Sequence, residues 1–319
     1  VLRTTNFTNE GFVNYKNVVT RSISKKNIAE KYLRHGDVII EKSGGSDKQP
    51  VGRVIFFEGE ENKYLFNNFT GLLRVQNPEE WLPKYVFYAL YAYYRNGGTR
   101  AFENRTTGLH NLQVDNYVKS VDIPKLSYRK QQHICETLDH VRDAVAYRER
   151  QLTKLDELIK ARFVEMFGDP YTNSKDYPLK KGESFFKLSN GKAVPESKRL
   201  NGGIPAYGGN GISWYTDESL FDADTIVVGR VGFQSGNVHL VKGPLWVTDN
   251  AMYMSSCDFS QYNLTFLIEL MAHVDFTKFQ DAGDLKKITQ RPFMQFEYLC
   301  PPLSLQNQFA DFVAEVDKS

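Results

Sequence analysis

The chain has 319 residues, of which 41% are hydrophobic and 24% charged, and its formal net charge is +2. This length is enough for two domains with separate cores, and no apolar run is long enough to cross a bilayer, which excludes a membrane span. The near-neutral charge excludes a chain that is basic throughout, so binding to a polyanion would have to rest on local groups of Lys and Arg.

The first half of the chain is predicted to combine short strands with one aromatic helix. β-Branched and aromatic runs at residues 51–57 and 64–69, separated by Gly and Asn clusters, are typical of strands. Residues 38–40 form a further apolar strand, which ends at Lys42. Residues 83–94 begin with Pro and are then apolar and aromatic, which predicts a helix.

A long helix is predicted next, because residues 128–167 contain no Gly or Pro and their apolar positions step alternately by four and three. At a rise of 1.5 Å per residue, this segment makes a rod of roughly 60 Å, which Gly168 and Pro170 end. A core helix of one globular domain is the alternative, but such helices are usually much shorter. The coiled-coil positions that would face a partner helix are Leu138, Val141, Val145, Leu152, Leu155, Ile159 and Met166.

The second half repeats the order of features in the first. Strands are predicted at residues 225–228, 238–241 and 251–254, followed by a helix at residues 264–273. Lys42 and Arg230 both follow an apolar strand, and each stands two positions before a glycine. Further on the offset between the copies becomes smaller, and Pro124 and Leu138 recur as Pro302 and Val316. We therefore predict one α+β domain that is present twice.

A final helix is predicted at residues 305–318, after the pair Pro301-Pro302. Its apolar face consists of Phe309, Phe312, Val313 and Val316. We expect this segment to be the start of a second long helix that is either cut short or completed by another chain.

This order of elements resembles the specificity subunits of type I restriction-modification systems. The stretches that carry the resemblance are residues 152–160 (Leu-Thr-Lys-Leu-Asp-Glu-Leu-Ile-Lys) with 162–168 (Arg-Phe-Val-Glu-Met-Phe-Gly), residues 204–212 (Ile-Pro-Ala-Tyr-Gly-Gly-Asn-Gly-Ile) and residues 301–308 (Pro-Pro-Leu-Ser-Leu-Gln-Asn-Gln). The resemblance covers nearly the whole chain, and the order of the motifs is more specific than any one of them.

The resemblance implies an α+β chain with two similar target-recognition domains, built of short strands plus helices and separated by a long coiled-coil-type helix. The expected boundaries are residues 1–127 for the first domain, 128–169 for the spacer helix, 170–302 for the second domain and 303–319 for the start of a second long helix. The second half opens with residues 177–180, and the first half has no counterpart for them, because Val1 already falls at the equivalent of Ala206. We therefore expect the first domain to be truncated at its N-terminal side, as the final helix is at its C-terminal side.

The resemblance also implies partners. Each domain would read one half of a split double-stranded DNA target, with the helix fixing the gap between the halves. Two modification subunits, which carry S-adenosylmethionine and methylate adenine, would bind the chain, as would the restriction and translocase subunits. Another specificity chain is a further partner left open.

Candidate DNA-binding residues are the basic and polar side chains in the predicted loops, because Lys and Arg bind phosphates and polar groups reach base edges. The amide of Asn210 can pair with adenine, and we expect Arg230 to contact guanine through two hydrogen bonds. For each residue, an exposed loop position without a ligand is the alternative. The candidates are Arg3, Thr4, Asn6, Lys42, Arg53, Arg100, Arg105, His110, Lys192, Tyr207, Asn210, Arg230, Lys286, Lys287 and Gln290.

No motif in the sequence predicts catalysis. The one Pro-Pro pair follows Cys300 and precedes Leu303, unlike the motif of an amino-methyltransferase, and no Gly-rich phosphate loop is present. Asp222 and Asp224 suit a turn before a strand better than a metal site. We expect a non-enzymatic subunit that binds DNA and needs no cofactor or metal. The alternatives are a protein-protein scaffold without specific DNA readout and an unrecognised nuclease with its own recognition domains.

The three cysteines, Cys135, Cys257 and Cys300, are far apart and form no Cys-x-x-Cys pair. The chain also does not open with a charged segment followed by an apolar one. The simplest interpretation is a cytoplasmic protein with reduced thiols.

Overall fold

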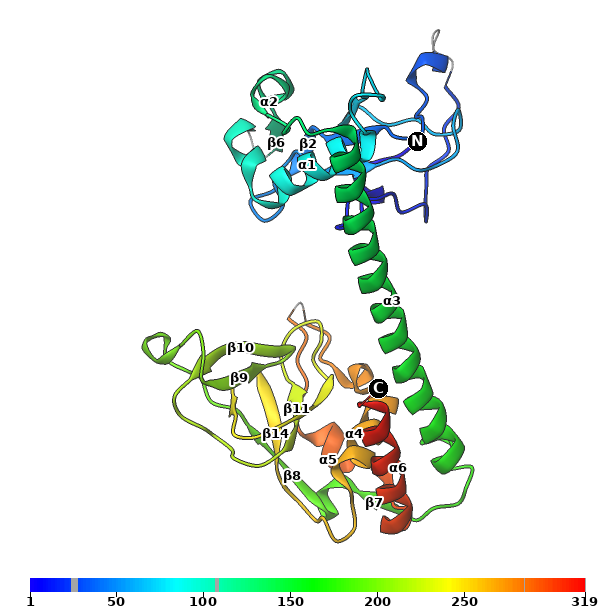
Figure 1. Ribbon diagram of the computed structural model, residues 1–319. Helices are drawn as coiled ribbons and strands as arrows, with labels where there is room; N and C mark the ends of the chain where they lie inside the picture. The colour runs from blue at the N-terminus through cyan, green and yellow to red at the C-terminus, as the bar shows by residue number, and fades with distance from the viewer. Residues whose placement is uncertain (24–27, 107–108, 284, 319) are drawn as a thin grey trace. The chain divides into compact units, whose positions relative to one another are not determined.

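The computed structural model describes residues 1–23, 28–106, 109–283 and 285–318, and its contacts divide the chain into two units (Figure 1). Unit 1 is Val1–Arg148 and unit 2 is Glu149–Ser319. The long helix α3, Tyr128–Phe167, contributes its first part to unit 1 and its second part to unit 2. Among the helices of the described ranges, none combines the length and apolar character that a membrane span requires.

The described residues of unit 1 form six strands and two helices before α3. The strands are β1 (Val38–Glu41), β2 (Ser43–Gly45), β3 (Val54–Phe56), β4 (Thr70–Leu73), β5 (Glu103–Thr106) and β6 (Leu109–Leu112). The helices are α1 (Pro83–Arg95) and α2 (Val114–Ser120), and a 3-10 turn, η3 (Gly98–Phe102), lies between α1 and β5.

In the described part of unit 2 the strands are more numerous, and three helices follow β14. The strands are β7 (Leu179–Lys181), β8 (Phe186–Asn190), β9 (Ile204–Gly208), β10 (Gly211–Thr216), β11 (Thr225–Gly229), β12 (Val238–Val241), β13 (Trp246–Val247), β14 (Ala251–Cys257) and β15 (Glu297–Leu299). The helices are α4 (Leu264–His273), α5 (Arg291–Gln295) and α6 (Leu303–Val316).

The central strands of the two units are paired in the same register. The sheet order is β3-β1-β4 in unit 1 and β12-β11-β14-β8 in unit 2. Ile39 of β1 faces Ile55 and Leu72. Val227 of β11, which the sequence repeat aligns with Ile39, faces the matching positions of β12 and β14, His239 and Tyr253. Identical pairing on both sides of the central strand shows that the sequence repeat is a repeat of structure.

The segments that follow the central strands are also paired alike. Ser43 faces Asn111 across the β2–β6 pair, and Val231 bridges Lys287 at the corresponding positions. The Leu112 N–H donates to the Lys42 carbonyl at 2.8 Å, and the Ile288 N–H donates to the Arg230 carbonyl at 2.9 Å. The α+β fold with two strand-rich regions and a long helix is therefore confirmed.

Two details of the sequence prediction were wrong. A strand was expected at residues 64–69, but β4 begins at Thr70, because the Tyr64 ring packs against Phe57 and Tyr15 in a loop before it. The counterpart of Leu138 is Val313 and not Val316, because α3 begins at Tyr128 and α6 at Leu303. Val313 and Val316 are nearly one helical turn apart, so the apolar spacing fits both alignments.

Each unit has its own core. In unit 2 the apolar cluster joins α4, α6 and the second part of α3, and it includes the buried side chains of Phe163, Phe167, Phe266 and Phe309. In unit 1 the cluster lies between β1, β3 and α1 and includes Val38, Val54, Phe87 and Leu90.

Candidate nucleic-acid interface

Five loops of unit 2 meet at one end of the β11–β14 sheet (Figure 1). β11 ends at Gly229 where β14 begins, and the turn between β9 and β10 packs directly against this position. A Cβ atom at Gly229 would lie 2.6 Å from the Gly209 carbonyl oxygen, so the close approach of the two backbones requires glycine there. The approach brings the exposed side chain of Asn210 to the end of β11.

Arg230 lies at the centre of these loops. Its N–H donates to the Asn250 carbonyl at 2.9 Å, and its Nη1 donates to the Asp249 carbonyl at 3.2 Å. Both partners belong to the turn before β14. The guanidinium is half-buried and held in place, while its remaining N–H groups meet no acceptor among the described residues.

The segment before α5 joins the same surface through its backbone. The Gly232 N–H donates to the Lys286 carbonyl at 2.8 Å, and Val231 bridges Lys287. Gln290 donates from Nε2 to Oδ1 of Asn190 at 3.2 Å, which links this segment to the end of β8. The Lys287 side chain is exposed and that of Lys286 is half-buried.

Lys192 completes the surface next to Asn190. Its N–H donates to the Val247 carbonyl at 2.8 Å, its carbonyl accepts from the Trp246 indole at 2.7 Å, and its side chain is exposed. On the adjoining strand β9, the Tyr207 carbonyl accepts the Thr248 N–H at 2.9 Å. The structure therefore brings together the main chains of all seven candidates of the second half, although the ring of Tyr207 packs against the apolar cluster that contains Val227 and Val247. We call this set the unit 2 loop surface: Lys192, Tyr207, Asn210, Arg230, Lys286, Lys287 and Gln290.

The sequence analysis missed Phe233, the most exposed large apolar side chain described. It lies in the loop after β11, and 91% of it is exposed. The loop is nevertheless tied down, because Gln280 Nε2 donates to the carbonyls of Phe233, at 3.3 Å, and Ser235, at 2.6 Å. The flanking residues Gly232 and Gly236 mark a loop, but no sequence signal distinguishes this exposed Phe from the buried ones.

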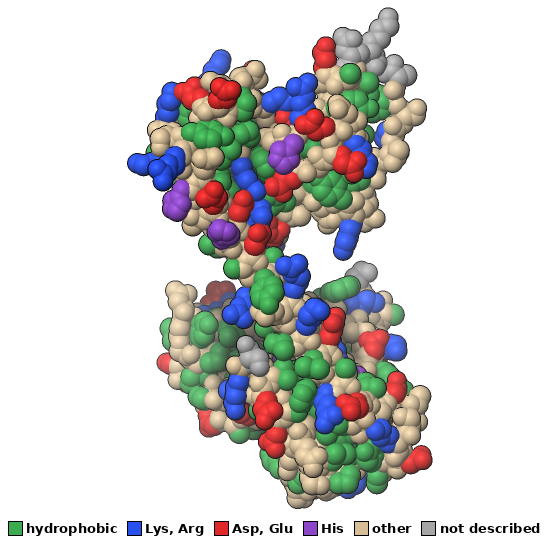
Figure 2. All heavy atoms as spheres, turned by 45° about the vertical axis from the view of Figure 1, so that its right-hand side comes forward, with side chains coloured by type: hydrophobic (Ala, Val, Ile, Leu, Met, Phe, Trp, Pro, Cys, Tyr) green, Lys and Arg blue, Asp and Glu red, His purple; other side chains and the backbone are tan. Residues whose placement is uncertain are grey.

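The acidic residues near the unit 2 loop surface are Asp249 and Asp281. Each meets a basic candidate through its backbone carbonyl: that of Asp249 accepts from Arg230, and that of Asp281 accepts from Lys286 Nζ at 3.5 Å. On the face of the molecule drawn in Figure 2, basic and acidic side chains are interspersed. The four basic residues Lys192, Arg230, Lys286 and Lys287 therefore meet at these loops with two acidic residues beside them.

Several first-half candidates are engaged inside unit 1. Asn6 is only 2% exposed, and its side chain bonds the N–H of Arg3 and the carbonyls of Asn14 and Lys16, so it holds a turn together. His110 is also buried and lies 2.9 Å from the Glu103 carboxylate. The side chains of Asn6 and His110 are both buried and already have partners within unit 1. The structure therefore does not favour the prediction that they contact DNA.

Arg53 has an internal role as well. Its Nε pairs with Glu41 at 3.1 Å, its Nη2 donates to the Thr4 carbonyl at 2.9 Å, and its guanidinium lies 5.2 Å from the ring centre of Phe7. Burial raises the pKa of Glu41, and the charge and hydrogen bond of Arg53 partly oppose this. The pair holds the N-terminal segment against the end of β1, directly before Lys42.

The remaining first-half candidates lie at or near the surface. Arg3 and Lys42 are half-buried, and Arg100 is exposed and donates to the Asp47 carbonyl at 3.1 Å. Arg100 lies in the 3-10 turn η3, in which Thr99 is fully buried. The side chain of Arg105 lies outside the described part of the structure.

The predicted coiled-coil positions of α3 differ along its length. In unit 1 and just after it, the apolar side chains are exposed, with fractions of 40% for Leu138, 56% for Val141, 53% for Val145 and 63% for Leu152. Near the C-terminal end of the helix, Leu155, Ile159 and Met166 pack into the unit 2 core, where α6 also lies.

Phe163 and Phe167, which the heptad pattern missed, are the most buried residues in that last part of α3. Together with Ile159 they follow steps of four. A straight helix has 3.6 residues per turn, so its buried side departs from a strict heptad over such a length.

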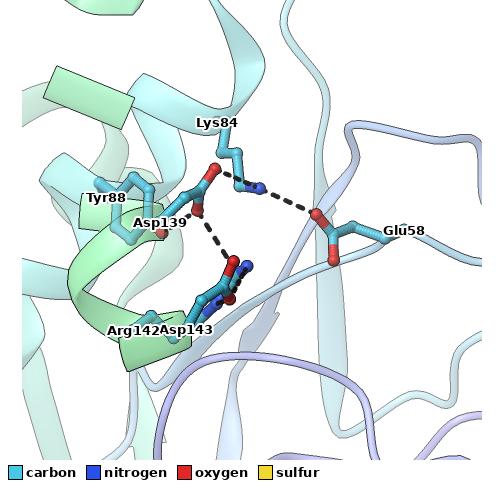
Figure 3. Close-up of polar contacts among 6 residues, drawn as sticks. All are labelled: Glu58, Lys84, Tyr88, Asp139, Arg142 and Asp143. Atoms are coloured by element: carbon cyan, nitrogen blue, oxygen red, sulfur yellow. Dashed lines mark hydrogen bonds and ion pairs between the residues drawn. The ribbon is translucent and has the colours of Figure 1, made fainter. Parts of the chain in front are cut away.

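The first part of α3 is fixed to α1 by a polar network (Figure 3). Lys84 Nζ lies 2.9 Å from Asp139 Oδ2 and 3.0 Å from Glu58, and the Tyr88 hydroxyl donates to Asp139 Oδ1 at 2.5 Å. Arg142 adds a contact at 3.3 Å to Asp139. Partial burial would raise the pKa of Asp139, but the hydrogen bonds from Tyr88 and Lys84 and the charges of Lys84 and Arg142 outweigh it, so its pKa is lowered.

The carboxylates of Asp222 and Asp224 stabilise turns by accepting hydrogen bonds. Asp222 accepts from the Ser219 hydroxyl at 2.5 Å, and Asp224 accepts from the Gly243 N–H at 3.1 Å. Within the described ranges, no three His, Cys, Asp or Glu residues are grouped as metal ligands would be.

Comparison with known proteins adds similarity in sequence and in fold, although no protein-family model matches the chain. A Haemophilus influenzae protein named as a type I restriction enzyme specificity subunit is 23% identical over 120 residues, which are 37% of this chain and 31% of that protein. The EcoprrI specificity subunit of Escherichia coli is 39% identical over 51 residues, 16% of this chain and 13% of that protein. The chain therefore matches less than a third of the length of each curated relative.

The fold similarity extends further than the sequence similarity. The crystal structure of the type I restriction-modification S subunit from M. genitalium matches 100% of this chain and 85% of its own, with a TM-score of 0.60 and 16% identity. At this identity, the match establishes a shared fold.

Proposed function

We propose that the chain is a specificity subunit of a type I restriction-modification system, to which its sequence and fold are similar, and that it reads the two halves of a bipartite double-stranded DNA target, one with each unit. In this proposal the two target-recognition domains are residues 1–127 and 170–302, residues 128–169 are the spacer between them, and residues 303–319 start a second long helix. The chain itself carries out no catalysis and needs no cofactor.

The observation that carries the proposal is the convergence of Lys192, Arg230, Lys286 and Lys287 on one end of the β11–β14 sheet, with amide side chains between them. Lys and Arg supply affinity through phosphates, while Asn210 and Gln290 offer the paired donor and acceptor that adenine matches. Main-chain hydrogen bonds position these loops. Lys42 occupies the position of Arg230 in unit 1, so a basic residue stands at this point in both halves.

We propose that the exposed apolar positions of α3 face helices of partner proteins. Leu138, Val141, Val145 and Leu152 are apolar, exposed and spaced as in a coiled coil, and such a stripe is stabilised when another helix covers it. The proposed partners are two methyltransferase subunits, the restriction and translocase subunits and, as a further candidate, another specificity chain.

A salt titration tests DNA binding. Binding of the chain to a random duplex is measured at about 50 mM and about 200 mM salt, with and without the modification subunit. Four phosphate contacts give a slope near −3.6 in log affinity against log salt, so the affinity should fall about 150-fold. A protein-protein scaffold would show no such dependence. The nuclease alternative is tested by incubating the chain with plasmid and magnesium. This alternative requires that the plasmid is cleaved, so an uncleaved plasmid would exclude it.

The sequence specificity is tested by mapping methylated bases in cells that carry the gene together with its partner subunits. The proposal predicts one two-part motif with a constant number of unspecified bases in between. A continuous motif, or a motif unaffected by substitutions in the unit 2 loop surface, would contradict it.

A further inference from the structure

The turn before β14 lies among the loops that form the unit 2 loop surface. It contains Asp249 and Asn250, and the carbonyls of both accept hydrogen bonds from Arg230, at 3.2 Å from Nη1 and at 2.9 Å from the main-chain N–H. A Cβ atom at Gly209 would lie 3.4 Å from the Asn250 carbonyl oxygen, so the turn that carries Asn210 packs against this one. The side chain of Asp249 therefore starts next to Arg230 and close to the turn of Asn210.

Unit 1 contains the same turn before β4. The Lys42 N–H donates to the Phe69 carbonyl at 2.7 Å, which matches the bond between the Arg230 N–H and the turn before β14. The first residue of β4 donates from its N–H to the carbonyl three residues earlier at 3.2 Å, and the first residue of β14 does the same at 3.0 Å. In this alignment, Asn68 of unit 1 occupies the position of Asp249 in unit 2.

The side chains at this repeated position are not used to hold the turn. Asp249 and Asn68 are exposed, and neither side chain makes a hydrogen bond or ion pair with another described residue. Asp and Asn are common in turns because they bond the nearby main chain, as Asp169 and Asp275 do with the N–H two residues later, at 2.7 Å and 3.2 Å. The repeated turn instead presents its acid or amide to the outside.

A carboxylate and an amide differ in the bases that they fit. The carboxylate only accepts hydrogen bonds, whereas the amide both accepts and donates. In the major groove, cytosine presents its N4 amino group without an acceptor beside it, and adenine presents its N6 amino group next to the acceptor N7. Asp249 therefore fits cytosine, and Asn68 fits adenine. Phosphates repel the Asp249 carboxylate, so a sequence without a donor for it is penalised.

We infer that the turns before β14 and β4 carry one base-reading side chain in each unit, Asp249 for a cytosine and Asn68 for an adenine. The cytosine lies at or beside the base pair whose guanine Arg230 contacts, because the Asp249 carbonyl holds the Arg230 guanidinium. The inference rests on the proposed DNA binding and adds two side chains that determine which target is bound.

The test exchanges the two side chains, one at a time, in the full chain together with the modification subunit. Duplexes that bind are selected from a random pool and sequenced. Asp249→Asn should replace a cytosine by an adenine in one half of the selected motif, and Asn68→Asp should replace an adenine by a cytosine in the other half. Competition between two duplexes that differ only at that base pair should show a preference of about 5- to 150-fold in the natural chain, reversed in the variant.

A control separates base reading from charge. Asp249→Asn removes a negative charge, so affinity for a random duplex should rise by about 2- to 5-fold, and Asn68→Asp should lower it by a similar factor. Asp281→Asn removes an exposed carboxylate from a residue whose carbonyl accepts from Lys286, so it lies beside the same surface. This control should raise the affinity for a random duplex equally and leave the selected motif unchanged. Retained binding to the random duplex also shows that each variant is folded.

The possible outcomes separate the inference from the proposed function. If the natural chain selects a two-part motif but either exchange leaves it unchanged, or alters it toward other bases, the inference is overturned and the proposed function stands. A motif that Asp281→Asn changes in the same way as Asp249→Asn also overturns the inference, since charge alone would then be responsible. If the natural chain selects no motif, the proposed function fails and the inference fails with it.

Discussion

Gln131 and Gln306 are fully buried side chains that make matching sets of three hydrogen bonds, one in each unit. Oε1 of Gln131 accepts the Leu82 N–H at 2.8 Å. Its Nε2 donates to the carbonyls of Glu80, at 2.9 Å, and Leu126, at 3.0 Å. Because Leu82 is the residue before α1, this amide ties the start of α1 to the start of α3.

Gln306 repeats the arrangement at the start of α4. Its Oε1 accepts the Asn263 N–H at 2.8 Å, and its Nε2 donates to the carbonyls of Gln261, at 2.9 Å, and Pro301, at 2.8 Å. In both units the accepted N–H belongs to the residue before the helix, and one carbonyl lies two residues earlier. The two amides therefore define equivalent points of the repeat, and each stands at the same position relative to the start of its own helix, α3 or α6.

We predict that Gln131→Leu and Gln306→Leu each destabilise their unit by about 1 to 3 kcal/mol, because each change leaves a buried N–H and two carbonyls without their partner. Urea unfolding followed by circular dichroism measures the loss. The exposed neighbours provide matched controls, since Gln132→Ala and Gln308→Ala should leave stability within about 0.5 kcal/mol. Equal effects of the buried and exposed substitutions would show that the shared hydrogen bonds do not stabilise the units.

Arg230→Ala should weaken binding to the cognate duplex by about 1 to 3 kcal/mol, or roughly 5- to 150-fold, if its guanidinium contacts guanine. Binding to a scrambled duplex should change much less. Lys242→Ala is the matched control, because Lys242 is exposed and follows β12 at the opposite end of the same sheet. Equal losses on both duplexes would identify a phosphate contact instead.

Phe233→Ala should weaken DNA binding without affecting the fold. A side chain that is 91% exposed stabilises the free protein little, but stacking on a base or wedging between bases is worth about 1 to 3 kcal/mol. The fluorescence of 2-aminopurine placed at successive positions of the target reports unstacking. Phe259→Ala removes another exposed ring, 59% exposed and next to the far end of β14, and should have no effect. If both substitutions behave alike, Phe233 has no special part in binding.

The network at Asp139 should make the stability of unit 1 depend on pH. The pKa of Asp139 in the folded chain lies below its ordinary value of 3.8, so its stabilising effect is complete above that pH and is lost as the pH falls through the folded pKa. Unfolding of the natural chain and of Asp139→Asn is compared between about pH 7 and about pH 2. The difference in the free energy of unfolding between the two proteins should become smaller as the pH falls. A difference that does not change with pH would show that packing, and not the charge of Asp139, stabilises unit 1.

The sequence predicted long elements well, and the reason is local. Residues 128–167 contain no helix breaker, and α4 matches its predicted range because Asn263 accepts hydrogen bonds from the N–H groups of Thr265 and Phe266. The repeat also located Arg230 at the end of its strand. The apolar strand and the glycine after it can be recognised in both halves of the sequence, even though the loops differ in length.

The sequence could not predict which candidate side chains are free. Asn6 and Asn210 occupy corresponding loops, yet Asn6 is buried and donates to the carbonyls of Asn14 and Lys16, whereas Asn210 is exposed. The exposure of Phe233 depends on contacts between more distant residues, those that Gln280 makes with its loop. Such differences arise from tertiary packing, which neither composition nor periodicity records.

The close contact between Gly209 and Gly229 has a consequence for how the unit 2 loop surface can evolve. These loops are joined mainly by main-chain atoms and by glycines, so the exposed side chains at positions such as 210 and 287 contribute little to holding them in place, while Arg230 adds one bond to the Asp249 carbonyl. Those positions can be exchanged without loss of the fold. Repertoires of targets could therefore diversify by single substitutions on one unchanged scaffold.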